Sequence, residues 1–252
     1  MQCKYLDNQV CVRSDGQYRL CCVSLEQNNK ENIKTHTPQE WHDSDFHKKT
    51  RMQMLKGEWP DACTRCELQE IQGIDSMRTR VKPDGTRYVR NFFGPGISHL
   101  DIRFGNSCNL KCVSCWEMSS SSIAEEAIAM KKAGIVPLHG VLEVPNFNWA
   151  SEETMKKFDE LPIREVYLTG GEPMMVRHLD KFLERLDPSV LVRFNTNGTI
   201  WNPKIEKLLR RFNMVIMSLS LDAASNKIDY IRSGSKWSEI EVNAQKYADF
   251  CK

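Results

Sequence analysis

Cys108-Asn-Leu-Lys-Cys112-Val-Ser-Cys115 is the most informative stretch of this chain, with three cysteines at CxxxCxxC spacing. It follows directly after a short apolar run at residues 97–104. Three thiolates on one tight loop can ligate three irons of a [4Fe–4S] cubane, and the fourth iron is then free to bind a small molecule. A structural zinc site uses four ligands, and this loop supplies three. The spacing therefore predicts a reactive iron–sulfur cluster.

Strand and helix patterns alternate on the carboxyl side of residue 97. Ser151 stands where a helix N-cap is expected, and Pro203 suits a first helical turn. Such alternation predicts a parallel sheet with right-handed crossovers. The fold class is therefore α/β, with about four β/α units. The predicted strands are 97–104, 164–168, 190–194 and 214–219, and the predicted helices are 122–133, 152–160, 176–186, 203–212 and 238–250.

Polar residues follow each of the four predicted strands. In a parallel barrel, functional groups gather where the carboxyl ends of the strands meet the following loops. We therefore expect these four loops to share one rim. They hold the cysteines of 108–115, the stretch Thr169-Gly170-Gly171-Glu172-Pro173, the pair Asn195 and Asn197, and the pair Ser220 and Asp222.

The CxxxCxxC loop and the Gly-Gly-Glu-Pro stretch, in this order and on these elements, resemble the radical S-adenosylmethionine (SAM) superfamily. The resemblance implies a partial (β/α) barrel of about four units, preceded by a small cysteine-rich hairpin and helix region. It also implies a [4Fe–4S] cluster on Cys108, Cys112 and Cys115. It also implies that the open iron binds the amino and carboxylate groups of SAM. Reduction of the cluster would then cleave SAM to methionine and a 5′-deoxyadenosyl radical, which abstracts hydrogen from a substrate.

The glycine-rich stretch has residues suited to SAM. Gly170 and Gly171 lack side chains, so backbone carbonyls can approach the SAM ammonium group closely. Glu172 adds an acceptor nearby, and Pro173 fixes the turn into the next helix. Trp116, beside the last cysteine, is expected to pack on adenine or, alternatively, in the core.

The remaining polar rim residues have two interpretations. Asn195, Asn197, Ser220 and Asp222 can reach the ribose hydroxyls or the methionine carboxylate of SAM, and Ser220 is favoured among them. A role in capping their own loops is the alternative for each. The histidines share no metal-ligand spacing, so we assign no catalytic residue among them.

Nine of the ten cysteines precede residue 116. In a reducing compartment, closely spaced cysteines are metal ligands or catalytic groups more often than disulfides. Gln9 to Cys22, with Asp15-Gly16 in the middle, predicts a β-hairpin with a tight turn. Residues 38–55 predict one or two short amphipathic helices.

Cys3, Gly16 and Cys21, followed by Cys63 and Cys66, resemble the auxiliary-cluster domains called SPASM and twitch. The resemblance implies one auxiliary iron–sulfur cluster, so two [4Fe–4S] clusters in all, placed before the barrel. Cys11 and Cys22 could replace a chosen ligand, because strand alternation lets only one of the adjacent Cys21 and Cys22 face inward easily. A four-cysteine zinc ribbon is the alternative for this region.

We expect three segments: an auxiliary-cluster domain at 1–78, a linker at 79–96 and a radical SAM core at 97–252. The core is about two strands short of the six that the family's barrel has, which indicates a shortened form or a fragment. The net charge of +2 favours neither nucleic acid nor membrane, and no apolar run reaches the length of a membrane span. No signal peptide is recognisable, so a cytoplasmic location is expected.

The resemblance implies a radical SAM oxidoreductase or maturase that acts on a peptide or protein. Dehydrogenation of a small alcohol or sugar is the alternative within the family. From another class, a non-catalytic metal-binding interaction module fits the short barrel. A flavodoxin or ferredoxin is the expected electron donor. Four available ligands at the auxiliary cluster favour electron transfer over substrate anchoring.

Overall fold

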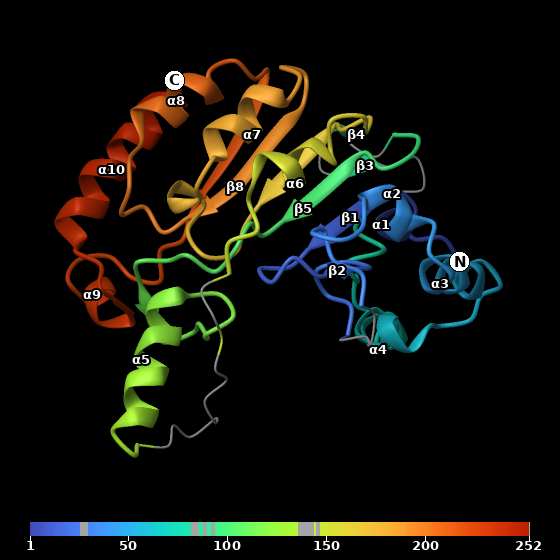
Figure 1. Ribbon diagram of the computed structural model, residues 1–252, viewed down its shortest axis with the longest axis horizontal. Coiled ribbons are helices and arrows are strands. Elements are labelled where there is room, and N and C mark those ends of the chain that lie inside the picture. The colour runs from blue at the N-terminus through green and yellow to red at the C-terminus, as the bar shows by residue number, and fades with distance from the viewer. Residues whose placement is uncertain are drawn as a thin grey trace.

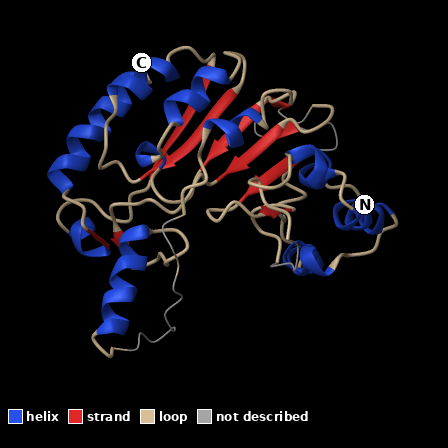
Figure 2. Cartoon of the chain, viewed as in Figure 1, coloured by secondary structure: helices blue, strands red, loops and turns tan. Residues whose placement is uncertain are grey.

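The computed structural model describes residues 1–25, 30–81, 86–87, 90–91, 94–135, 144 and 147–251. Its centre is a six-stranded sheet in the order β2-β1-β5-β7-β8-β9, drawn as arrows in Figure 1 and in red in Figure 2. The strands are β1 (Gln9–Val12), β2 (Tyr18–Arg19), β5 (His99–Ile102), β7 (Glu165–Leu168), β8 (Leu191–Thr196) and β9 (Met214–Leu219).

The predicted α/β architecture is confirmed. All four strands expected after residue 97 are present, and β5, β7, β8 and β9 are adjacent and parallel. Each is followed by helical structure, so the connections are the crossovers that a parallel sheet requires. The helices of this part are α5 (Ser121–Lys132), α6 (Glu152–Lys156), η2 (Pro173–Met175), α7 (Leu179–Arg185), α8 (Pro203–Leu209), α9 (Lys227–Ile231) and α10 (Trp237–Phe250).

Local signals explain where these helices begin. Ser151 caps α6 in a capping box with Thr154, and Asn202 accepts hydrogen bonds from the first turn of α8, where Pro203 follows it. The helix predicted from residue 176 begins only at Leu179. The reason is that His178 has a left-handed backbone (φ 66°), which ends the preceding turn and separates it from α7.

The amino-terminal hairpin forms as predicted but belongs to the main sheet. β1 pairs with β2 antiparallel and with β5 in parallel, with Val10 opposite Leu100. The sheet therefore crosses the boundary placed at residue 78, and the division into 1–78, 79–96 and 97–252 stays a prediction. The region also holds α1 (Lys4–Asn8), α2 (Pro38–His42), α3 (Asp45–Leu55), η1 (Asp61–Cys63) and α4 (Thr64–Ile71), gathered at one side of the molecule (Figure 1).

Two short ribbons lie outside the main sheet. β3 (Thr86–Arg87) pairs with β4 (Arg90–Asn91) within the segment 79–96 that was predicted as a linker. β6 (Lys111–Cys112) pairs with β10 (Arg232–Ser233), which joins the cysteine loop to a segment 120 residues later in the chain. The sequence patterns did not predict this second ribbon.

The two faces of the sheet differ sharply in chemistry. Val10, Leu100, Val166 and Val192 are fully buried on one face and share a core with side chains of α6, α7 and α8. Alternate residues of the same strands point to the opposite face. Apart from Cys11 and Leu191, these residues are polar and yet buried or half-buried, and they are Gln9, His99, Asp101, Glu165, Tyr167, Arg193 and Asn195.

Candidate active site

The cysteine loop is fastened to the start of α5. Ser120 caps the helix, and its hydroxyl donates to the carbonyl of Leu110 at 2.6 Å. The hydroxyl of Ser122 donates to the carbonyl of Cys108 at 2.8 Å. Ser121 accepts from the Cys108 backbone N–H at 3.2 Å. The serine run therefore holds the backbone of the first cysteine in place.

The three thiols lie close enough to influence one another. Burial is the main cause that raises the pKa of Cys108, Cys112 and Cys115. The charge of a neighbouring thiolate raises each pKa further: Cys112 acts on Cys108, Cys115 on Cys112, and Cys108 on Cys115. Three mutually coupled sulfurs on one loop are the donor set that an iron–sulfur cluster uses. The residues present therefore fit a cluster with three protein ligands.

Arg232 is a site residue that the sequence patterns missed. Its Nη1 lies 3.8 Å from the Sγ of Cys112, and its Nε pairs with the Oδ2 of Asp222 at 2.8 Å. The guanidinium lowers the pKa of Cys112, against the larger effect of burial. It would favour the thiolate that ligates metal. Asp222, predicted to reach SAM, is the partner that orients this arginine.

The glycine pair requires both its backbone conformation and its lack of side chains. Gly170 has φ 76° and Gly171 has φ 53°, in the left-handed region. A Cβ on Gly171 would lie 2.4 Å from the carbonyl oxygen of Ser107, and one on Gly170 would lie 2.6 Å from Arg103. The backbone of the glycine stretch thus packs directly on the segment that leads into the cysteine loop. Glu172 N–H donates to the same Ser107 carbonyl at 2.8 Å.

The carboxylate of Glu172 connects the glycine stretch to the end of β8 by hydrogen bonds. Its side chain is buried, and its carboxylate accepts from Asn197 N–H at 2.7 Å and Thr196 Oγ1 at 2.8 Å. It also accepts from Met174 N–H at 3.0 Å, which caps the short helix begun by Pro173. Burial raises the pKa of this carboxyl, and these hydrogen bonds oppose the shift. The contacts tie the end of β8 to the glycine loop, while direct contact with SAM stays a prediction.

Asn195 and Asn197, at the end of β8, contact different parts of the structure. Asn197 donates to Asn109 Oδ1 at 2.9 Å and approaches the Sγ of Cys108 at 4.0 Å. Asn195 donates to the hydroxyl of Tyr167 at 2.8 Å, on the polar face of the sheet. Ser220 is tied to β8 by its backbone N–H, which donates to Thr196. The structure thus brings Asn197 to the cysteine loop and places Asn195 elsewhere.

Trp116 is not a core residue. Its side chain is 47% exposed and lines a cavity of about 250 Å³. Arg13, Arg19, Arg103 and Cys22 also line this cavity. An exposed indole beside the cysteine loop is available for stacking, and its packing on adenine stays a prediction.

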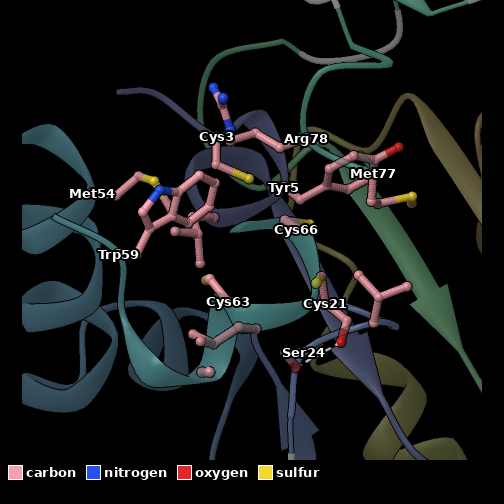
Figure 3. Close-up of a pocket in the computed structure, with 14 residues that line it drawn as sticks. Cys3, Tyr5, Cys21, Ser24, Met54, Trp59, Cys63, Cys66, Met77 and Arg78 are labelled. Carbon is pink, nitrogen blue, oxygen red and sulfur yellow. Dashed lines mark hydrogen bonds between the residues drawn. The ribbon is translucent and has the colours of Figure 1, made fainter. Parts of the chain in front are cut away.

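The four predicted auxiliary ligands come together in one cavity. Figure 3 shows Cys3, Cys21, Cys63 and Cys66 around a common space, flanked by Met54, Trp59 and Arg78. Burial raises the pKa of Cys3 to about 11 and that of Cys63 to about 12, and it raises that of Cys21 strongly. The set joins the start of the chain, the hairpin and the η1–α4 turn. The metal it holds stays a prediction.

The two proposed substitutes face elsewhere. Cys22 lines the arginine-rich cavity beside Trp116 and a second cavity over the sheet, and Cys11 is buried 3.7 Å from Arg103 Nη1. Neither lines the cavity of the four predicted ligands. Cys21 and Cys22 thus face different cavities, but both lie beyond the end of β2, so a turn rather than strand alternation separates them.

The cavity over the polar face of the sheet measures about 520 Å³. It was missed at the sequence level, although polar residues at every second position of β5, β7 and β8 could have indicated it. Its wall includes Gln9, His99, Asp101, Tyr167, Arg193 and Asn195. Tyr5 and Met77 line both this cavity and that of the auxiliary cysteines, so the two spaces are separated by single side chains.

Among the residues that the structure describes, no three His, Cys, Asp or Glu side chains converge closely enough to hold a single metal ion. None of the helices in the described ranges combines the length and apolar character needed to cross a membrane.

The fold and site define a barrel-type α/β protein with a cysteine-rich centre at the carboxyl edge of its sheet. The model of the radical SAM superfamily matches residues 102–250, more than half of the chain. The chain therefore belongs to the radical SAM superfamily. Membership implies a [4Fe–4S] cluster and SAM, and it confirms that part of the predicted resemblance. The SPASM or twitch assignment has no such support.

Several relatives are similar over half of the chain or more. A probable GTP 3′,8-cyclase of Methanocella arvoryzae is 33% identical over 138 residues, 52% of this chain and 38% of the relative. One of Archaeoglobus fulgidus is 23% identical over 159 residues, 63% of this chain and 47% of the relative. The GTP 3′,8-cyclase of Thermodesulfovibrio yellowstonii is 28% identical over 141 residues, which are 54% of this chain and 38% of the relative. The chain thus spans less than half the length of these relatives.

Proposed function

We propose that this chain is a radical SAM oxidoreductase or maturase that cleaves SAM reductively at Cys108, Cys112 and Cys115 and acts on a peptide or protein. An auxiliary [4Fe–4S] cluster on Cys3, Cys21, Cys63 and Cys66 assists by electron transfer. The observation that carries the proposal is the position of the 520 Å³ cavity. It lies over the polar face of the sheet and shares Tyr5 and Met77 with the four-cysteine cavity.

The bound cluster and SAM would supply a 5′-deoxyadenosyl radical, the agent of hydrogen abstraction. The chain's own residues hold and orient the reactants. Arg232 favours the thiolate of Cys112, and the glycine pair exposes backbone next to the cysteine loop. Trp116 presents a free aromatic face for adenine. Glu172 keeps the end of β8 in register with the glycine stretch.

The auxiliary cysteines favour a cluster that passes electrons. All four available positions are thiols, so no iron is left open to bind a substrate. The burial that raises their pKa values also shields this site from water. A flavodoxin or ferredoxin in a reducing cytoplasm is the electron donor that this chemistry suits. A zinc ribbon at the same four thiols, within a non-catalytic module, is the competing proposal, and it requires the thiols to draw closer together than they lie in the described residues.

A second candidate function is the cyclisation of a nucleoside triphosphate. Two observations favour it: the relatives are named GTP 3′,8-cyclases, and three arginines line the cavity beside Trp116. Arginine clusters bind phosphate oxygens well. Dehydrogenation of a small alcohol or sugar remains the third candidate, since the polar cavity has hydrogen-bonding groups for hydroxyls.

One assay distinguishes the three candidate functions. The chain is reconstituted anaerobically with iron and sulfide, reduced with dithionite and given SAM with a capped-peptide library, GTP or an aminocyclitol. The proposal predicts about eight irons per chain, as two cubanes require, and a peptide product changed by loss of hydrogen. Stimulation by GTP alone would favour the second candidate. Stoichiometric zinc without SAM cleavage would contradict all three.

A further inference from the structure

The strongest unexplained feature outside the cysteine sites is the side chain of Gln9. It is 1% exposed, it lines the 520 Å³ cavity, and neither its Nε2 nor its Oε1 has a hydrogen-bond partner in the part of the chain that the structure describes. A buried amide without partners is costly, because it has lost its hydrogen bonds to water. Such a group at a cavity wall points to a ligand that supplies the missing partners.

The neighbouring strand adds a second acceptor at the same wall. Gln9 pairs in register with His99 on β5, and Asp101 lies two residues further on the same face. Asp101 is 2% exposed, and its Oδ1 has an ion pair with Arg103 at 3.7 Å but no hydrogen bond. The wall therefore presents one amide that both donates and accepts, and one carboxylate oxygen that accepts.

The charges of the cavity wall are balanced within the protein. Arg193 lies 3.4 Å from Glu165 and stacks over the ring of Tyr167 at 4.3 Å. Arg103 faces Asp101. Each arginine is thus committed to a buried carboxylate, and a polyphosphate placed here would meet the carboxylate of Asp101 on the cavity wall. The wall favours a neutral ligand rich in hydrogen-bonding groups.

We infer that this cavity binds a neutral amide group of the substrate and that Gln9 is a specificity-determining residue for it. An extended residue presents its N–H and C=O on the same edge, as paired strands show, and the planar amide of Gln9 can meet both. A primary carboxamide offers the same pair of groups. The inference rests on the proposed function and narrows its substrate class.

The test measures binding to the anaerobically reconstituted chain by saturation-transfer NMR. The probes are N-acetyl-trialanine N-methylamide for backbone amides, propanamide for a primary carboxamide, and GTP. We expect one or both amide probes to bind, and Gln9→Leu to weaken that binding about tenfold or more. Gln72→Leu, which alters an exposed glutamine at the end of α4, is the matched control and should bind as the wild type does.

The probe that loses affinity in Gln9→Leu identifies the kind of amide that the cavity binds. If N-acetyl-trialanine N-methylamide binds more weakly to the variant, the substrate supplies a backbone amide. If propanamide binds more weakly, the substrate supplies a side-chain carboxamide. Unchanged amide binding in Gln9→Leu, or Gln9-dependent binding of GTP alone, overturns the inference. Circular dichroism checks that Gln9→Leu is folded. Formation of 5′-deoxyadenosine by the wild type without a probe tests the proposed function separately.

Discussion

The glycine pair shows how single residues determine the site. Gly171→Ala should lower the free energy of unfolding by more than about 2 kcal/mol, because it combines a left-handed backbone with a Cβ placed 2.4 Å from a carbonyl oxygen. It should also abolish SAM-dependent formation of 5′-deoxyadenosine, since the glycine loop must move. Denaturant unfolding and product analysis measure the two effects.

Gly57→Ala is the matched control. Gly57 also has positive φ, 85°, but nothing lies within 4 Å of its Cβ position. We expect this variant to lose about 1 kcal/mol from backbone strain alone and to cleave SAM normally. Equal loss of activity in both variants would contradict the role given to the contact with Ser107.

His47 should make the fold sensitive to acid. It is fully buried against Trp41 and near His42, and burial lowers its pKa to about 3. The unfolded chain titrates near 6.5, so only the unfolded state gains a proton as pH falls from 6.5 toward 3. The free energy of unfolding should therefore drop by about 2 kcal/mol between pH 7 and pH 5.

His47→Leu provides the check on this pH dependence. Denaturant titrations of the two proteins at pH 7 and pH 5 should show a smaller drop for the variant, because the group that the unfolded state protonates is gone. An identical pH dependence in both proteins would show that other groups control acid stability.

Gln9→Leu should separate stability from binding. The side chain has no hydrogen bond to lose in the described structure, and burying an amide without partners costs about 1 kcal/mol or more. We expect the variant to unfold with a free energy about 1 kcal/mol higher than the wild type. A decrease in denaturant titrations would mean that the amide is satisfied within the protein.

For single residues, the sequence predicted which residue types form the site better than it predicted their contacts. Cys108, Cys112 and Cys115 follow from spacing alone, since all three lie within eight residues. Arg232 was missed because its place beside Cys112 depends on a pairing across 120 residues. Glu172 was expected to face SAM, yet its hydrogen bonds to β8 depend on how two loops pack.

At the scale of elements, the auxiliary site depends on the junction at which η1 leads directly into α4. Cys63 ends η1, and Cys66 lies one turn on, so both reach the same cavity as Cys3 and Cys21 (Figure 3). Replacing Cys63 and Cys66 by alanine should reduce the iron content from about eight to about four per chain. SAM cleavage should continue, while substrate turnover should stop.

Iron analysis together with product analysis checks this prediction. The matched control is Cys251→Ala, since Cys251 is exposed at the end of α10 and far from both cysteine sets in sequence. Normal iron content after removal of Cys63 and Cys66 would rule out the auxiliary site at these residues.

The strands and helices after residue 97 were predictable because each has a local sequence signal, either the spacing of its apolar residues or a residue typical of a helix start. The strands coincide with β5, β7, β8 and β9, and Ser151 and Pro203 stand at helix starts. The place of the hairpin was not predictable. Its pairing with β5 joins residues about 90 positions apart, and no local pattern encodes such a contact.

At the scale of the whole molecule, one sheet connects the two cysteine sites. β2 and β1 bring the amino-terminal cysteines to the sheet, and β5 through β9 bring the family's cysteine loop and glycine stretch to its carboxyl edge (Figure 1). The polar face between them is continuous from Gln9 to Ser218. The 520 Å³ cavity on this face adjoins the four auxiliary cysteines through Tyr5 and Met77, which is the basis of the proposed function.

The proposed function depends above all on reductive cleavage of SAM at Cys108, Cys112 and Cys115. The most direct measurement is the yield of 5′-deoxyadenosine from the anaerobically reconstituted chain with dithionite and SAM, compared with that of Cys112→Ala. The wild type should form 5′-deoxyadenosine and Cys112→Ala should form none. An iron-loaded wild type that forms no 5′-deoxyadenosine, or a Cys112→Ala variant that forms as much as the wild type, would contradict the claim.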